Sequence, residues 1–142
     1  MVTPETYTGA VLAVNAIWTL LDQRRYEDIL PYLTPDCAWE RMEGWRHGHD
    51  ELRASFNARP SDLFTRHLVT NFTVELADDG KLKGRCYVVC YAAKTEDQDA
   101  IQLIDHPFII ADADFEFVQS GQRVLISKIS VHQTFAIAAP IK

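Results

Sequence analysis

Histidine is the side chain best matched to proton transfer near neutral pH, and His67 opens a run that alternates in character as far as Leu76. Because alternate residues of a strand share a face, Val69, Asn71 and Thr73 would lie on the side of His67. The opposite face would carry the apolar side chains Leu68, Phe72, Val74 and Leu76. The mixed face indicates either a strand that lines a pocket or a strand exposed to solvent, with a structural or surface histidine.

Asp22 is the carboxylate that could act together with a histidine. It lies near the C-terminal end of a predicted helix over residues 4–24, where the helix dipole disfavours negative charge. It is therefore either a solvated acid at a helix end or a buried acid that orients an imidazole. In the second case the carboxylate fixes one ring nitrogen and leaves the other as a base. The residues alone do not bring Asp22 and His67 together.

Other polar side chains are candidates for substrate binding. Arg41 shares a predicted strand face with Trp39 and either binds an anionic group or carbonyl of a substrate or forms a surface ion pair. Asn71 either donates a hydrogen bond to a substrate oxygen or has a structural role. Asp112 and Asp114 have the types needed for acid–base work, although carboxylates at a strand end are usually solvated.

The cysteine and histidine spacings predict neither a disulfide nor a metal site. Of the three cysteines, Cys86 and Cys90 are four apart in a predicted strand, so their Cα atoms would lie ~13 Å apart. That separation is too long for a disulfide, and the cysteines are interpreted as small buried hydrophobes. His47 and His49 lack the further ligands of a zinc site. Without a glycine-rich phosphate loop, no cofactor is predicted.

The order of the predicted elements is typical of an α+β fold. Apolar residues at three- and four-residue spacing predict an amphipathic first helix: Val11, Val14, Ile17, Trp18 and Leu21. Further helices are predicted at 26–33 and 49–58, and strands at 37–42, 63–77, 81–94, 108–118 and 123–136. Residues 95–105 form a polar connection. A strongly curved sheet wrapped round the helices would make a cone whose open end holds a ligand, within a single domain over 1–142.

Composition excludes several classes of function. A net charge of −6 disfavours nucleic-acid binding, which needs a basic surface. No apolar run approaches the ~18 residues of a membrane span. The N-terminal segment MVTPETYTGA lacks the basic start and apolar core of a signal peptide, so a cytoplasmic protein is expected.

Four segments, in this order and spacing, carry a family resemblance: LLDQRRYEDILPYLTPDCAWE, HGHDELRASF, TRHLVTNFTV and SGQRVLISKISV. The chain resembles the SnoaL-like branch of the NTF2-like superfamily, which includes scytalone dehydratase, polyketide cyclases and the dehydrochlorinase of lindane degradation. The resemblance implies N-terminal helices packed in the concave face of a strongly curved, mixed, mainly antiparallel sheet.

The resemblance also implies a catalytic pair. In the dehydratase and dehydrochlorinase relatives an Asp at the end of the first helix pairs with a His at the start of the long strand, and these positions fall on Asp22 and His67. A second pocket histidine of the dehydratase falls near Ala92, which favours the face of Cys90 as the pocket side of its strand. We expect five residues to bind substrate: Trp18, Trp39, Arg41, Asn71 and Cys90.

Some positions depart from the relatives. Leu21 stands where scytalone dehydratase carries Tyr, and its second pocket Tyr and His fall near Arg41 and Ala92. Gln122 stands where the family carries Trp before a retained Arg123. We therefore expect shared chemistry on a different substrate.

The expected function is a cofactor-independent lyase or isomerase acting on a small apolar, oxygenated cyclic compound such as a polyketide, terpenoid or steroid-like molecule. The alternative is a non-catalytic ligand-binding or assembly subunit, like the small subunit of ring-hydroxylating dioxygenases. The predicted apolar sheet face of Phe72, Val74 and Leu76 needs a cover, so a homodimer or homotrimer through the sheet is expected.

Overall fold

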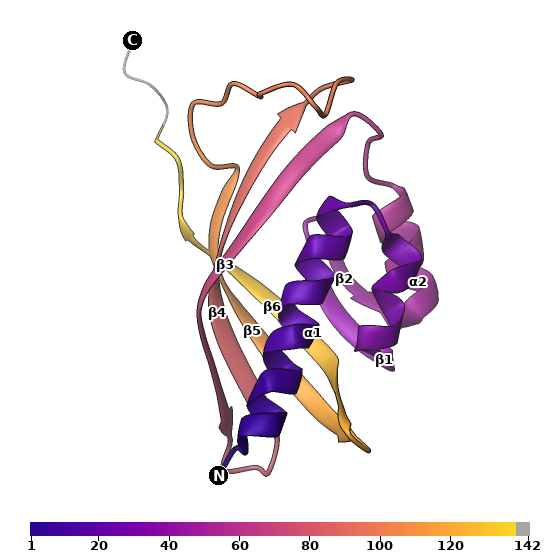
Figure 1. The fold of residues 1–142 in the computed structure, drawn as a ribbon, viewed down its shortest axis with the longest axis vertical. Helices are drawn as coiled ribbons and strands as arrows, with labels where there is room; N and C mark the ends of the chain where they lie inside the picture. Colours follow the sequence, from indigo (N-terminus) through magenta and orange to yellow (C-terminus); the bar gives the residue numbers. More distant parts are fainter. Residues whose placement is uncertain (139–142) are drawn as a thin grey trace.

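The structure, a computed structural model, describes residues 1–138 of the chain. In this part of the chain, six strands form one sheet and two α-helices lie on one side of it (Figure 1). The helical elements are α1 (Pro4–Asp22), the 3₁₀ turns η1 (Tyr26–Asp28) and η2 (Leu30–Tyr32), and α2 (Gly48–Asn57). The strands are β1 (Leu33–Arg41), β2 (Gly44–His47), β3 (Leu63–Leu76), β4 (Leu82–Lys94), β5 (Ile109–Ser120) and β6 (Arg123–Phe135).

Local sequence signals mark the start of α1, and the backbone of Arg24 marks its end. The Thr3 side chain accepts a hydrogen bond from the backbone N–H of Thr6 at 3.1 Å, and Pro4 occupies the first turn. The helix ends at Asp22, two residues before the predicted end, because Arg24 adopts a left-handed backbone with φ +60°. The side of α1 that faces the sheet is buried and consists of Ala10, Ala13, Val14, Ile17, Trp18, Leu20 and Leu21.

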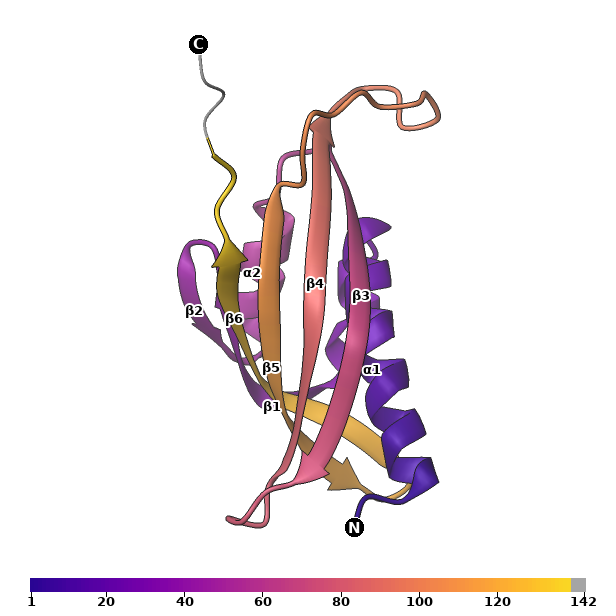
Figure 2. The same ribbon diagram turned by 90° about the vertical axis from the view of Figure 1, so that its left-hand side faces the viewer.

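The sheet confirms the predicted cone. Its strand order is β2-β1-β6-β5-β4-β3, with β1 and β6 parallel and all other neighbours antiparallel. The helix α1 crosses the concave face (Figure 1), and Figure 2, turned by 90°, shows the long strands in front and α1 beside and partly behind β3. The core lies between the helices and the concave face; its largest fully buried side chains include Trp39, Phe56, Phe115, Ile17 and Leu21.

The four long strands fall within two residues of their predicted bounds, whereas the shorter elements differ. The predicted helix over 26–33 is the two 3₁₀ turns η1 and η2. The segment before α2 contains β2, a strand that the sequence did not predict and that pairs with β1. A strand of four residues is too short to show an alternating pattern, so only its long-range pairing reveals it.

The connection from β4 to β5, residues 95–108, contains no helix or strand, as predicted for its polar first part (top of Figure 1). No helix in the described part of the chain has the length and apolarity needed to cross a membrane.

The predicted division of β3 into two faces is correct only for its first half. The pairing of β3 with β4 is irregular between Thr70 and Thr73, which is a β-bulge, and Asn71 in the bulge has φ +57°. Beyond the bulge, Phe72 packs on Phe117 with ring centroids 6.3 Å apart and therefore faces inward. The predicted exposed apolar face of Phe72, Val74 and Leu76 is therefore wrong: Phe72 and Val74 pack against the core, and only Leu76 is exposed.

The bulge makes a specific prediction about position 71. Asn71→Val should lower the free energy of unfolding by about 1–2 kcal/mol, because a β-branched residue tolerates the left-handed region poorly. Asn71→Gly should leave it nearly unchanged, because glycine adopts this region freely. The control Thr73→Val, at an exposed strand position, should change it by less than about 0.5 kcal/mol. Urea unfolding measures all three, and equal losses for the two valine variants would contradict the bulge.

Candidate active site

The end of α1 and the first half of β3 bring Asp22 and His67 into direct contact. Asp22 Oδ1 lies 2.6 Å from His67 Nδ1, and Asp22 Oδ2 accepts a hydrogen bond from the His67 backbone N–H at 2.8 Å. The two side chains are only 9 % and 11 % exposed. The carboxylate thus holds both the ring and the backbone of the histidine. His67 Nε2 makes no hydrogen bond to any residue that the structure describes.

The Asp22 carboxyl is held in its charged form. Burial alone would raise its pKa, but hydrogen bonds from the His67 ring and backbone and from Thr65, with the charge attraction of His67, outweigh burial. The pKa of Asp22 therefore lies below its ordinary value of 3.8. An ionised carboxylate accepts hydrogen bonds only, so His67 Nδ1 carries the proton and donates it toward Asp22.

Two residues that the sequence did not single out support the carboxylate. The Thr65 hydroxyl donates to Asp22 Oδ1 at 2.7 Å and accepts from Arg59 Nη2 at 3.0 Å. Arg59 Nη1 also donates to the backbone carbonyl of Leu21 at 2.8 Å. Arg59 therefore links the end of α1 to the start of β3. No local pattern marks it, because its partners lie 38 and 6 residues away in the chain.

The aromatic residue Trp18 covers the imidazole of His67. The two rings stack with centroids 4.7 Å apart and an interplanar angle of 24°. Trp18 is 5 % exposed, and its Nε1–H is buried without a hydrogen-bond partner among the described residues. A buried donor without a partner costs about 1–3 kcal/mol.

Trp39 packs against Trp18, and Arg41 in turn packs on Trp39. Trp39 meets Trp18 edge to face at 5.5 Å and is fully buried. The Arg41 guanidinium lies over the Trp39 and Phe56 rings, at 5.1 and 5.2 Å from their centroids. Arg41 does not form the surface ion pair that was the alternative prediction. No carboxylate of the described residues lies within 4.0 Å of its guanidinium nitrogens.

The inner face of β4 carries Cys90, opposite His67 in the strand pairing. Burial, with the negative charge of Asp22, raises the pKa of the Cys90 thiol to about 12. The thiol is therefore neutral at physiological pH and provides a small apolar surface beside the dyad of Asp22 and His67.

The remaining polar candidates lie away from Asp22 and His67. Asn71 is exposed in the bulge of β3. Asp114 pairs with Arg85 at 2.7 Å, and Asp112 accepts a hydrogen bond from Thr134 at 3.1 Å. In the described residues, no group of His, Cys, Asp and Glu side chains is arranged to hold a metal ion.

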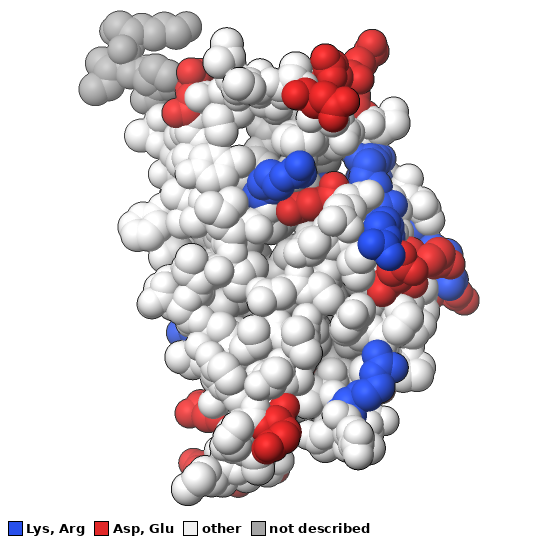
Figure 3. All heavy atoms as spheres, in the orientation of Figure 1, with Lys and Arg blue, Asp and Glu red and all other residues white. Residues whose placement is uncertain are grey.

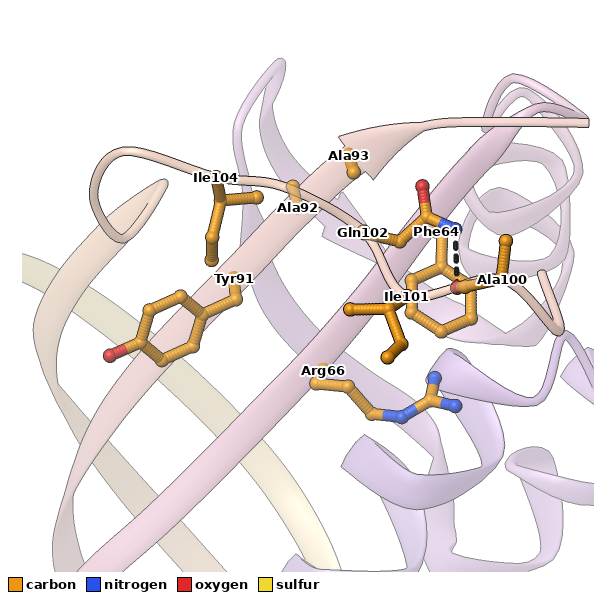
Figure 4. Close-up of a pocket in the computed structure, with 9 residues that line it drawn as sticks. All are labelled: Phe64, Arg66, Tyr91, Ala92, Ala93, Ala100, Ile101, Gln102 and Ile104. Atoms are coloured by element: carbon orange, nitrogen blue, oxygen red, sulfur yellow. Dashed lines mark hydrogen bonds between the residues drawn. The ribbon is translucent and has the colours of Figure 1, made fainter. Parts of the chain in front are cut away.

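Two of the cavities in the described part of the chain lie near these elements, and neither of the two is lined by Asp22 or His67. The first, about 570 Å³, lies between α2 and the β1–β2 hairpin, and Arg41 and Arg59 line it. The second, about 300 Å³, lies where the 95–108 connection folds over the start of β3 and the end of β4. Figure 4 shows Ile101 and Ile104 of the connection on one side of it and Arg66 and Tyr91 of the strands on the other.

The sequence model of one domain, described as SnoaL-like, matches residues 9–121, most of the chain. This chain is a SnoaL-like protein. The family predicted from the four sequence segments is thereby confirmed. No curated protein matches this SnoaL-like chain.

Solved structures of similar fold extend the comparison. A putative scytalone dehydratase from Novosphingobium aromaticivorans is 12 % identical, with a TM-score of 0.76 over 96 % of the SnoaL-like chain and 89 % of its own. A type 2 hexachlorocyclohexane dehydrochlorinase is 16 % identical, with a TM-score of 0.74 over 96 % and 90 %. ActVI-ORFA from Streptomyces coelicolor is 13 % identical, with a TM-score of 0.74 over 90 % and 96 %. At these identities the likeness shows the fold.

Proposed function

We propose that this SnoaL-like protein is a cofactor-independent lyase or isomerase that removes a proton from a small, mostly apolar, oxygenated cyclic compound, such as a polyketide, terpenoid or steroid-like molecule. The observation that carries the proposal is the 2.6 Å contact between Asp22 Oδ1 and His67 Nδ1, which leaves Nε2 without a partner among residues 1–138. A histidine oriented in this way is a general base matched to neutral pH.

The proton transfer follows from the orientation of the ring. His67 Nε2 takes a proton from a carbon next to a carbonyl, and the ionised Asp22 stabilises the imidazolium that forms. The electron pair of the broken C–H bond moves onto the carbonyl oxygen. In an elimination, the pair then expels a leaving group from the adjacent carbon, and the leaving group takes the proton from the imidazolium. In an isomerisation, it returns to a different, conjugated carbon, which takes up that proton. In a cyclisation, it returns to the same carbon as that carbon bonds to a second carbonyl carbon, whose oxygen takes up the proton.

The residues around the imidazole are suited to bind the reacting part of such a compound. Trp18, whose ring stacks on the imidazole, would contact the reacting part of the compound. Trp39 and Cys90 would supply apolar walls. Two structural relatives bear the names of elimination enzymes, a putative scytalone dehydratase and a dehydrochlorinase, in agreement with this chemistry.

A generic carbon acid tests the proposal without knowledge of the natural substrate. A base removes the ring C–H proton of nitrobenzisoxazole while the N–O bond breaks, which releases a coloured cyano-nitrophenolate. We expect the wild-type protein to open this ring faster than the same concentration of free imidazole, because the dyad places an oriented base in an apolar site. A rate no higher than that of imidazole would contradict the proposal and favour the non-catalytic alternative.

We also propose that the protein forms a homodimer or homotrimer through the convex face of the sheet. Phe72 and Val74 pack against the core and so cannot form this interface as the sequence had suggested. Other apolar side chains are exposed on the sheet and on the 95–108 connection: Leu68, Tyr87, Ile101, Leu103 and Phe108. Light scattering after gel filtration should give two or three times the chain mass, and Leu68→Glu should lower it, because a charge opposes burial in an interface. A monomeric mass for the wild-type protein would contradict the proposed homo-oligomer.

A further inference from the structure

The cavity of about 570 Å³ beside α2 has a polar lining that is more basic than the chain as a whole. Its charged residues are Arg41, Arg46, Arg59, Glu43 and Glu51, which give a net charge of +1 in a chain of net charge −6. On the face drawn in Figure 3, most Lys and Arg atoms lie on the side of α2, and few lie over α1.

The two glutamates of the cavity are already engaged. Glu43 accepts a hydrogen bond from the Ser55 hydroxyl and lies 3.8 Å from Arg46. Glu51 accepts from the His47 backbone N–H at 2.7 Å. Neither carboxylate lies within ion-pair distance of Arg41. The negative charge of the lining therefore does not neutralise that guanidinium directly.

Arg41 is held in a fixed orientation with free donors. Its Nε donates to the Ser55 hydroxyl at 3.2 Å, and its guanidinium lies over the Trp39 and Phe56 rings. Nη1 and Nη2 make no hydrogen bond to any residue that the structure describes. Burial lowers the pKa of Arg41 to about 10, so the group remains charged at neutral pH. A fixed, charged guanidinium whose Nη1 and Nη2 have no partner among the described residues presents two parallel donors, which is the geometry that a carboxylate group accepts.

We propose that this cavity binds a small organic monocarboxylate, whose two oxygens accept from Nη1 and Nη2 of Arg41. The apolar part of the lining, which includes Met42, Ala54, Ala58 and Leu63, suits the apolar part of such a molecule. A phosphate dianion fits less well, because Glu43 and Glu51 in the same lining repel a second negative charge.

The site borders the candidate active site but does not depend on it. Arg59 lines the cavity and also donates to Thr65, which donates to Asp22. The bound acid is therefore either the anionic end of the substrate or a separate ligand. Because the proposal concerns binding, it is tested without any measurement of turnover, and its failure leaves the proposed proton abstraction by His67 untouched.

Calorimetry with matched probes tests the site at neutral pH. Cinnamate should bind wild-type protein at least about tenfold more tightly than cinnamamide, which has the same shape without the charge. Arg41→Met should weaken cinnamate binding by about 10- to 100-fold, the range expected for hydrogen bonds to a charged group. Arg41→Lys keeps the charge but loses the two parallel donors and should fall between. Arg25→Met, which removes an exposed arginine paired with Asp28, should bind cinnamate as wild type does.

A second measurement uses only the wild-type protein, in case Arg41→Met does not fold. In amide NMR spectra, cinnamate should shift the signals of Ala54, Ala58 and Leu63, which line the cavity. The proposal is wrong if cinnamate and cinnamamide bind equally or not at all, if a folded Arg41→Met variant binds cinnamate normally, or if the shifts cluster elsewhere. Displacement of cinnamate by an equal concentration of inorganic phosphate would also overturn it.

Discussion

His67→Ala should lower the protein-dependent rate of nitrobenzisoxazole opening by about 10²- to 10⁴-fold, the range that a positioned general base contributes. In the wild-type protein, Asp22 holds Nδ1 at 2.6 Å and Trp18 stacks on the ring, so Nε2 is the nitrogen that is free to take a proton. The alanine variant keeps the backbone N–H that donates to Asp22 Oδ2. The measurement is the initial rate at saturating and subsaturating probe concentrations.

The matched control for this variant is His132→Ala. His132 lies on the convex face, its side chain is 63 % exposed, and it forms an ion pair with Asp114 at 3.5 Å. Its removal should leave the rate unchanged within about twofold, since exposed ion pairs contribute little to structure. Circular dichroism confirms that both variants are folded. If folded His67→Ala opens the ring at the wild-type rate, His67 is not the base.

Asp22→Asn should have the second large effect, on both rate and stability. An amide keeps the shape of the carboxylate but cannot stabilise an imidazolium, and its NH₂ group no longer favours the tautomer with the proton on Nδ1. We expect the rate to fall by about 10²-fold or more, as when the carboxylate that orients a catalytic histidine is replaced. The free energy of unfolding should fall by about 1.5–3 kcal/mol at neutral pH, because hydrogen bonds to a charged acceptor are lost.

The stability effect of Asp22→Asn should depend on pH in a defined direction. The folded-state pKa of Asp22 lies below its ordinary value of 3.8, so the folded protein binds fewer protons at this site than the unfolded chain. The stabilisation is complete above the ordinary value and disappears as the pH falls through the lowered folded-state pKa. Urea unfolding should therefore show wild type and variant converging in acid. A difference that stays constant with pH would mean that the Asp22 charge is not what stabilises the fold.

The sequence predicted the larger elements well, because their signals are local. Thr3 and Pro4 mark the start of α1, and long alternating or β-branched runs mark the four long strands. The strand β2 and the bulge at Asn71 were not predicted. Both depend on pairing with a distant strand, which sets the register of the chain but leaves no periodic pattern. One bulge moved Phe72 from the expected outer face to the core.

The candidate site was only partly accessible from sequence. Asp22 and His67 are the residue types that proton transfer needs, but the expectation that they touch came from the family resemblance. Their contact is present in the structure. Thr65 and Arg59, which support Asp22, were not expected, since an arginine before a proline at the end of a predicted helix has no distinctive pattern. The packing of α1 on β3 determines their contacts, and that packing is tertiary.

The tautomer of His67 tests the central claim most directly. Nitrogen NMR of the imidazole, at a pH where the ring is neutral, distinguishes a proton on Nδ1 from a proton on Nε2. The account predicts that wild-type His67 carries its proton on Nδ1, toward Asp22, with Nε2 unprotonated, and that Asp22→Asn loses this preference. A wild-type ring that carries its proton on Nε2 would contradict the account, because the nitrogen assigned as the base could not accept a proton.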